Sequence, residues 1–268
     1  MRFALLLAAT LAYAQDILIS SEELAKKLGN PKLVLLHSGM KQDYEAGHLP
    51  GARLVTLADL SVTGPNGLRL ELPSEDALRA SLMKLGIGDD SEVVIYTGND
   101  SVQSATRIWF TFDYLSLKAR LLNGKPKGLP MTTEVPTIVP ATKLTTKVRP
   151  ELVVDAAWIQ KNAKTAIVDA RLPEFYTGAD KGMMTRGGRL PGAKNVSFSS
   201  LLKEDKSFLP ASELAAKLGE DDMIVYCHIG MQATVPYFAA RLTGKKVRLY
   251  DGSFQDWSSK AELPVEPK

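Results

Sequence analysis

The chain has 268 residues, of which 45% are hydrophobic and 24% are charged, a composition that excludes a largely disordered or collagen-like protein. This length accommodates two domains of roughly 100–130 residues, each with its own core. The formal net charge of +3 is too small to predict a nucleic-acid partner.

The N-terminal segment has the pattern of a secretory signal peptide. Arg2 precedes an apolar run from Phe3 to Leu11, and Ala12-Tyr13-Ala14 has the small-x-small pattern that signal peptidase cleaves. We expect residues 1–14 to be removed as a signal peptide and the mature protein to be periplasmic or secreted; an anchor or a first helix is the alternative. Later in the chain, no apolar stretch approaches the roughly 20 residues of a membrane-spanning helix.

The two halves of the chain repeat the same motifs in the same order. Gly47-His48-Leu49-Pro50-Gly51-Ala52 recurs as Gly188-Arg189-Leu190-Pro191-Gly192-Ala193, and Val94-Ile95-Tyr96-Thr97-Gly98 recurs as Ile224-Val225-Tyr226-Cys227-His228. The offset falls from 141 (188 − 47) to 130 (226 − 96), because the first half is longer near Gly64-Pro65-Asn66-Gly67, which has the composition of an inserted turn. The repeat predicts two similar domains.

The predicted domains cover residues 16–125 and 150–262. Between them, residues 126–149 contain four prolines with several Thr and Lys, and lack a sustained apolar period. Such a composition is typical of an extended, semi-rigid linker that holds two domains in a fixed relation.

Within each half, short β-branched runs alternate with amphipathic stretches. Five apolar runs are predicted to be buried parallel strands: Leu33 to Leu36, Val93 to Tyr96, Ala166 to Val168, Met223 to Tyr226, and Val247 to Tyr250. Helices are predicted after the hydroxyl cap Ser20, over Ala211 to Leu218, and over Ala233 to Leu242. This alternation predicts an α/β fold in which each domain has a central, mostly parallel sheet flanked by helices.

Cys227 is the only cysteine in the chain. An unpaired cysteine in an exported protein is buried and inert, pairs with another molecule, or takes part in catalysis, and composition alone does not decide among these. Cys227 lies between a predicted strand and a predicted helix, at the carboxyl end of the strand, where open α/β sheets bind ligands. The N–H groups of the following helix favour an anion or a thiolate there.

Four motifs now point to a known family. Ile167-Val168-Asp169-Ala170-Arg171 is similar to its first strand with an Asp-x-Arg ending, and Arg189 to Ala193 is similar to its His-Ile-Pro-Gly-Ala segment. Cys227 to Gln232 falls on its active loop, and Tyr250 to Trp257 resembles its closing Gly-Gly-x-x-x-Trp signature, with Trp257 expected to pack against the domain. The chain thus resembles the tandem-domain rhodaneses, the thiosulfate and 3-mercaptopyruvate sulfurtransferases, along essentially its whole mature length.

This resemblance implies a double-displacement mechanism with Cys227 as the catalytic residue. The Cys227 thiolate would take sulfane sulfur from a small anionic donor, thiosulfate or 3-mercaptopyruvate, and the persulfide would pass it to a thiophilic acceptor, cyanide or a thiol. The active-loop amides are expected to bind the persulfide anion: His228, Ile229, Gly230, Met231, Gln232 and Ala233. Asp169 and Arg171 are expected to support the loop. No metal or organic cofactor is implied.

The first half has Thr97 at the position of Cys227 and His37 at the position of Asp169. A hydroxyl cannot carry a persulfide, so the first domain is predicted to be catalytically silent and to cover the active site. The chain has three histidines in separate loops, away from any cluster with metal-ligand spacing, and no zinc site is predicted.

Donor preference is left open by the active loop. It lacks the Arg and Lys that thiosulfate-preferring relatives often carry, and only His228 could be a cation there, where a charged form would stabilise the thiolate. Arg186 and Arg189, beside Gly187 and Gly188, are candidate donor ligands, although each is equally compatible with a solvated surface position.

Two other functions use the same cysteine. In the first, Cys227 holds persulfide for a specific partner, as a carrier without turnover or as a redox-sensing module. In the second, the chain is a phosphatase of the rhodanese-like fold, which is less favoured because those enzymes have a longer loop ending in Arg, whereas Gln232 precedes the helix here. A monomer is expected.

Overall fold

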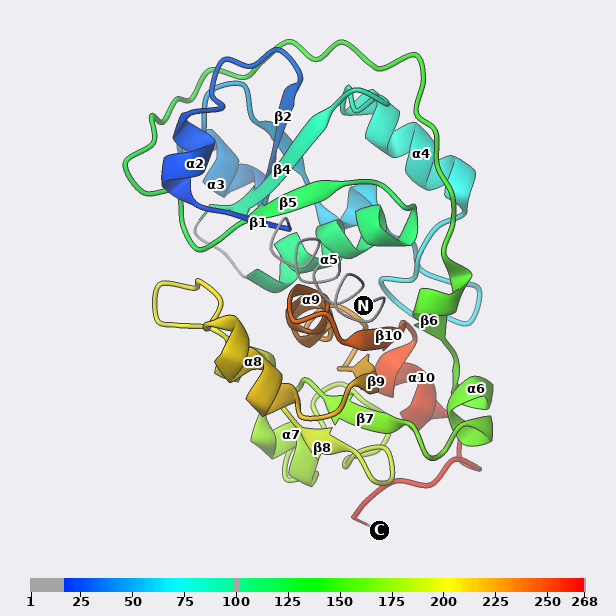
Figure 1. The fold of residues 1–268 in the computed structure, drawn as a ribbon. Helices are drawn as coiled ribbons and strands as arrows, with labels where there is room; N and C mark the ends of the chain where they lie inside the picture. The colour runs from blue at the N-terminus through cyan, green and yellow to red at the C-terminus, as the bar shows by residue number, and fades with distance from the viewer. Residues whose placement is uncertain (1–16, 99–101, 268) are drawn as a thin grey trace, which may run out of the picture.

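Each half of the chain forms a five-stranded sheet in which every strand pair is parallel (Figure 1). This computed structural model describes residues 17–98 and 102–267. The first sheet has the order β1-β5-β4-β2-β3, with strands Leu18–Ile19, Ala119–Leu122, Glu92–Thr97, Leu33–Ser38 and Arg53–Val55. The second has the equivalent order β6-β10-β9-β7-β8, with strands Val153–Val154, Lys246–Tyr250, Asp222–Tyr226, Ala166–Asp169 and Lys194–Asn195.

Helices flank both sheets, as expected for parallel strands joined by crossovers. In the first domain they are α2 Ser21–Ala25, α3 Lys41–Ala46, α4 Glu75–Lys84 and α5 Val102–Tyr114. In the second they are α6 Ala156–Lys161, α7 Pro173–Thr177, α8 Ala211–Leu218, α9 Thr234–Leu242 and α10 Ser253–Ser259. Three single 3₁₀ turns cover Leu57–Asp59, Pro150–Leu152 and Phe198–Leu201.

The predicted α/β architecture is confirmed. The five predicted apolar runs form β2, β4, β7, β9 and β10, each starting or ending within two residues of its predicted limit. Ser20 caps α2 by accepting a hydrogen bond from Glu23 N at 3.1 Å. The other strands have only two to four residues, so a period of two is too short to recognise in their sequences.

Strand register places the repeated motifs at equivalent points of the two sheets. His37 is paired with Tyr96 across β2 and β4, and Asp169 is paired with Tyr226 across β7 and β9. Thr97 and Cys227 each follow the tyrosine of their own pair. The sheet geometry therefore supports the equivalence of Thr97 and Cys227 that the sequence repeat predicts.

The two domains pack through the helices that follow these equivalent positions. Helices α5 and α9 lie against each other between the sheets (Figure 1). Trp109 meets Phe238 edge-on with 4.7 Å between ring centroids, and Phe110 meets Tyr237 in the same way at 4.8 Å. These residues belong to one hydrophobic core shared by both domains.

A buried carboxylate joins the two domains beside this core. Asp113 of α5 accepts a hydrogen bond from the Tyr237 hydroxyl at 2.8 Å. It also forms ion pairs with Arg149 at 2.7 Å and with Arg241 at 3.0 Å. Asp113 therefore connects the first domain to the connecting segment and to the second domain.

The connecting residues 126–149 are extended and form neither a helix nor a strand of either sheet. They run over the outer surface of the first domain, as the green trace in Figure 1 shows. Thr132 pairs with His48 through two backbone hydrogen bonds of 2.8 and 2.9 Å, and Arg149 N donates to Tyr114 O at 2.8 Å. The segment is therefore attached to the first domain along its length.

Within the described ranges, no helix has the length and apolar character needed to cross a membrane. The predicted signal peptide, residues 1–14, lies outside the described residues, and its removal stays a prediction.

Candidate active site

Cys227 follows the last residue of β9, and its side chain is buried, with 1% of its surface exposed. The first turn of α10 holds the backbone around it. Phe254 N donates to Cys227 O at 2.9 Å, and Gln255 N donates to His228 O at 2.9 Å. Cys227 N donates to the hydroxyl of Ser253 at 3.2 Å. The carbonyls at the start of the active loop are thus turned toward α10.

The active loop, residues 227–233, presents a run of backbone donors. Among the hydrogen bonds of the described residues, none has the N–H of residues 228 to 233 as donor, whereas Thr234 N donates to Met231 O at 3.0 Å. These six consecutive N–H groups lie between the cysteine and the N-terminus of α9, where partial positive charge gathers. Consecutive amides of this kind form an anion-binding concavity.

Gly230 gives the active loop its tight turn. Its φ of +83° lies in the left-handed region that glycine adopts without strain. A Cβ atom at this position would lie 2.7 Å from Asp251 O, so a side chain would also collide with the segment after β10. Glycine is therefore required at this position by conformation and by space.

His228 is partly buried and packs edge-on against Phe175, with 4.6 Å between ring centroids. Its Nδ1 atom lies 3.4 Å from Oε1 of Gln232. Burial, with the nearby charge of Arg171, lowers the pKa of His228 below its ordinary value. The neutral ring is therefore favoured at pH 7, contrary to the suggestion that a charged His228 stabilises the thiolate.

Asp169 and Arg171 form a fully buried ion pair at the end of β7, with 2.6 Å between Oδ2 and Nη2. The same Nη2 atom donates to Gly188 O at 2.7 Å, and the guanidinium lies 4.1 Å from the ring centre of Phe254. Because Phe254 N holds Cys227 O, this pair supports α10 and, through it, the active loop. These contacts link both residues to the active loop through α10, and their supporting role stays a prediction.

Arg186 does not face a free anion site. Its guanidinium donates to four backbone carbonyls of the C-terminal segment, at 2.7 to 3.0 Å: Trp257, Ser258, Lys260 and Leu263. These contacts use four of the five N–H donors of the guanidinium and hold the end of α10. We therefore correct the suggestion that Arg186 is a donor ligand and assign it a structural role.

Arg189 is also held away from the active loop. Its guanidinium stacks over the ring of Tyr176 at 4.4 Å and pairs with Glu266 at 3.4 Å. The sequence suggested Arg189 and Arg186 as ligands of the sulfur donor because cations beside glycines are typical of a mobile binding loop. The direction of a long side chain is not encoded in such a local pattern.

The equivalent position of the first domain has a different chemistry. Thr97 is 3% exposed, and its hydroxyl has no hydrogen-bond partner among the described residues. His37 takes the place of Asp169, and its Nδ1 lies 3.2 Å from the Tyr96 hydroxyl. Burial lowers the pKa of His37 to about 4, so the ring is neutral at pH 7. This position carries neither a thiol nor a buried ion pair.

Sequence reasoning missed Ser253 at the active site. Its φ of +51° is rare for a residue with a side chain, and its hydroxyl accepts from Cys227 N while donating to Tyr250 O at 2.8 Å. The motif Tyr250 to Trp257 drew attention to Trp257, which is buried and donates to Pro264 O at 2.8 Å. A serine within that motif carries no signal of its strained backbone.

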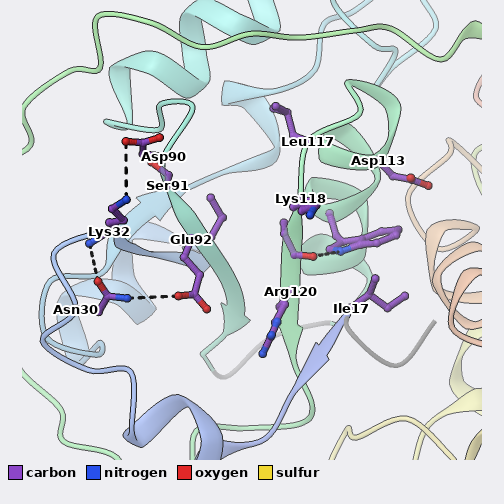
Figure 2. A pocket seen from close by; sticks show the side chains of 13 residues that line it. Ile17, Asn30, Lys32, Asp90, Ser91, Glu92, Asp113, Leu117, Lys118 and Arg120 are labelled. Atoms are coloured by element: carbon purple, nitrogen blue, oxygen red, sulfur yellow. Dashed lines mark hydrogen bonds and ion pairs between the residues drawn. The ribbon is translucent and has the colours of Figure 1, made fainter. Parts of the chain in front are cut away.

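A cavity of about 290 Å³ lies elsewhere in the first domain (Figure 2). The cavity lies at the edge of the first sheet where β1, β2, β4 and β5 begin. Thr97 lies at the opposite edge, where β4 ends. Asn30 and Glu92 on its wall are hydrogen-bonded at 3.4 Å. No residue of the active loop lines it, so we do not assign it to the chemistry of Cys227. Within the described ranges, no cluster of His, Cys, Asp and Glu could hold a metal ion.

Two similar parallel α/β domains, of which the second has a cysteine between strand β9 and helix α9, define the class of tandem α/β proteins. The sequence profile of the rhodanese-like domain matches residues 20–125 and 155–260. The chain therefore belongs to the rhodanese-like family, with two such domains in tandem.

Named relatives align with nearly the whole chain. A sulfur carrier protein, TtuD of Thermus thermophilus, is 29% identical over 93% of this chain and 96% of its own length. A thiosulfate sulfurtransferase of Corynebacterium glutamicum is 26% identical over 93% of this chain and 90% of its own. The structure of a 3-mercaptopyruvate sulfurtransferase from Leishmania major superposes with a TM-score of 0.81 and 20% identity, covering 94% of this chain and 76% of the other. The chain is thus similar to sulfurtransferases in sequence and to one in fold.

Proposed function

We propose that the protein is a sulfurtransferase that carries sulfane sulfur on Cys227. The observation that carries this proposal is the run of six loop amides that donate to no acceptor among the described residues, beside the only cysteine in the sequence. An anionic sulfur on Cys227 would receive these donors without any prior rearrangement of the loop, which is how preorganised amides stabilise charge. Family membership and the names of the relatives support the same reaction.

The reaction balances without a cofactor. The Cys227 thiolate attacks the outer sulfur of thiosulfate, the donor S–S bond breaks, and its electron pair leaves with sulfite. A new S–S bond leaves Cys227 as a persulfide anion. Cyanide or a thiolate then attacks the outer sulfur, and the Cys227 thiolate is released. With 3-mercaptopyruvate, a C–S bond breaks instead and the departing carbanion takes a proton to give pyruvate.

Intact-mass measurement of the mature protein after incubation with thiosulfate or 3-mercaptopyruvate tests the first step. We expect one added sulfur atom in the wild type and none in Cys227→Ser. Thr97→Ala is the matched control, because it alters the equivalent position of the first domain, and it should load sulfur like the wild type. Failure of both donors to load the wild type would refute the proposal.

Turnover separates an enzyme from a carrier. We expect cyanide or a dithiol to remove the sulfur repeatedly with steady-state kinetics. A persulfide that forms but resists these small acceptors would instead favour a carrier with a specific protein partner, as the name of the Thermus relative suggests. Release of phosphate from a model ester, lost in Cys227→Ser, would favour the phosphatase.

A further inference from the structure

One buried cation of the first domain reaches the active loop of the second. Arg107 lies on α5 and is 2% exposed. Its Nη1 atom donates to Gly230 O at 3.2 Å and to Oδ1 of Asp251 at 2.5 Å. Its Nη2 atom donates to Leu70 O at 2.5 Å. A single guanidinium therefore joins the active loop, the segment after β10 and a loop of the first domain.

The contact with Gly230 fixes the direction of one peptide group. In a trans peptide, the C=O and the following N–H point in opposite directions. Because Arg107 holds Gly230 O on the side of the first domain, the N–H of Met231 is directed the other way. Met231 N is one of the six loop N–H groups that have no acceptor in the described part of the chain. Glycine offers little resistance to rotation of this peptide, so without the guanidinium the carbonyl could turn toward an anion on Cys227.

The charge of Arg107 also matters because a carboxylate lies beside it. Asp251 is 7% exposed, and it accepts hydrogen bonds from Arg107 and from Leu72 N, the latter at 3.0 Å. A Cβ atom at Gly230 would lie 3.0 Å from Oδ1 of Asp251, so this carboxylate is in direct reach of the active loop. Without Arg107, its negative charge would oppose a thiolate or persulfide on Cys227.

The segment that inserts into the first half of the repeat supplies the remaining contacts. Val62 and Glu71 pair as an isolated bridge on either side of the turn at Gly64, and the loop between them contacts the second domain. Arg69 N donates to Oε1 of Gln255 at 3.0 Å, and Nε2 of Gln255 donates to Arg69 O at 2.9 Å. Gln255 N in turn holds His228 O. The first domain thus braces both halves of the active loop.

We propose that Arg107 is a positioning residue for the active loop, supplied by the domain that lacks a sulfur-carrying residue. It orients the Gly230 carbonyl and neutralises Asp251, so that the loop presents N–H groups and no net negative charge to Cys227. This inference rests on the proposed function and assigns to the first domain a part in the chemistry beyond covering the site.

The rate of alkylation of Cys227 by iodoacetamide, measured against pH, tests this proposal without requiring sulfur transfer. The chain has one cysteine, so the label reports a single site. In Arg107→Met we expect the rate profile to move to higher pH and the rate near pH 7 to fall about tenfold, because the uncompensated Asp251 carboxylate disfavours the thiolate. Arg107→Lys keeps the charge but cannot span three acceptors, and we expect an intermediate rate. It also provides a milder variant if Arg107→Met does not fold.

Arg149→Met is the matched control. Arg149 also pairs with a buried carboxylate at the domain boundary, Asp113, and makes no contact with the active loop. We expect it to lower stability and to leave the alkylation profile at its wild-type position. In Arg107→Met with Asp251→Asn, relief of the charge should restore part of the rate, and the remaining deficit measures the lost carbonyl contact.

Identical profiles for wild type and Arg107→Met, or equal shifts in Arg107→Met and Arg149→Met, would overturn the positioning role. Loading of wild-type Cys227 with sulfur is measured separately. If the wild type fails to load, the proposed sulfurtransferase function is refuted, while the alkylation profiles still decide whether Arg107 controls the loop. If the wild type loads, the Arg107→Met variant should show a reduced kcat for transfer to cyanide.

Discussion

The hydroxyl of Tyr226, the residue before Cys227, donates to the carboxylate of Asp169 at 2.5 Å. In the first domain, the equivalent tyrosine hydroxyl of Tyr96 lies 3.2 Å from Nδ1 of His37. Both tyrosine oxygens also accept a backbone N–H from the Leu-Pro-Gly-Ala motif, from Leu190 at 3.1 Å and from Leu49 at 2.9 Å. Both domains therefore have the tyrosine, but its partner differs. In the second domain the partner belongs to the Asp169–Arg171 ion pair, and in the first it is the neutral ring of His37.

The buried ion pair predicts a strong dependence of stability on Arg171. Substitution of Arg171 by Met leaves Asp169 buried without its cation, and breaking such a pair costs about 3–5 kcal/mol. Arg189→Met is the matched control, because its pair with Glu266 is partly exposed and pairs of that kind contribute about 0–1 kcal/mol. Urea unfolding at pH 7 measures both changes. Equal losses in the two variants would show that burial of the Arg171 pair does not determine its contribution.

The neutral His37 predicts that the protein loses stability in mild acid. Burial, and to a lesser extent the charge of His48, lowers the pKa of His37 from 6.5 to about 4. The unfolded state therefore binds a proton more readily, and the stabilisation present above pH 6.5 is lost as the pH falls toward 4. Between about pH 7 and pH 5 the expected loss from His37 alone is about 2 kcal/mol.

Unfolding free energies of wild type and His37→Asn at these two pH values measure this loss. His228, whose pKa is also lowered by burial, contributes in the same direction, so His228→Asn serves as the comparison. The three histidines also allow a direct NMR titration of each ring. A His37 ring that titrates near pH 6.5 in the folded protein would contradict the prediction.

The contacts of Asp113 predict that its carboxylate contributes strongly to the free energy of unfolding. Asp113→Asn removes the carboxylate shared by Arg149, Arg241 and the Tyr237 hydroxyl, at an expected cost of about 3 kcal/mol. Asp222→Asn breaks two ion pairs of β9 whose carboxylate is exposed, and it should cost less than about 1 kcal/mol. Urea unfolding followed by tryptophan fluorescence reports on the boundary, because Trp109 lies in it. A loss no greater than that of Asp222→Asn would rule out a joining role for Asp113.

The sequence predicted the parts of the fold that are local. Strands β2, β4, β7 and β9 each contain a continuous apolar run, and Cys227 lies at the junction of such a run with a helix, so both could be recognised without tertiary information. The pairing of Arg107 with Gly230 joins residues 123 positions apart and leaves no local pattern. Arg186 shows the converse, because its glycine-rich surroundings suggested a ligand site while its guanidinium turns to the carbonyls after α10. Contacts between the halves, and the directions of long side chains, required the structure.

The apolar faces of α5 and α9 have a consequence for the second half of the chain when it is separated from the first. If the chain were cut between residues 126 and 149, the second half would display the rings of Tyr237 and Phe238, both fully buried in the whole protein, together with an Arg241 deprived of Asp113. Such an exposed patch promotes aggregation. We therefore expect the second half to aggregate when it is produced alone, because its solubility depends on helix α5 of the first half.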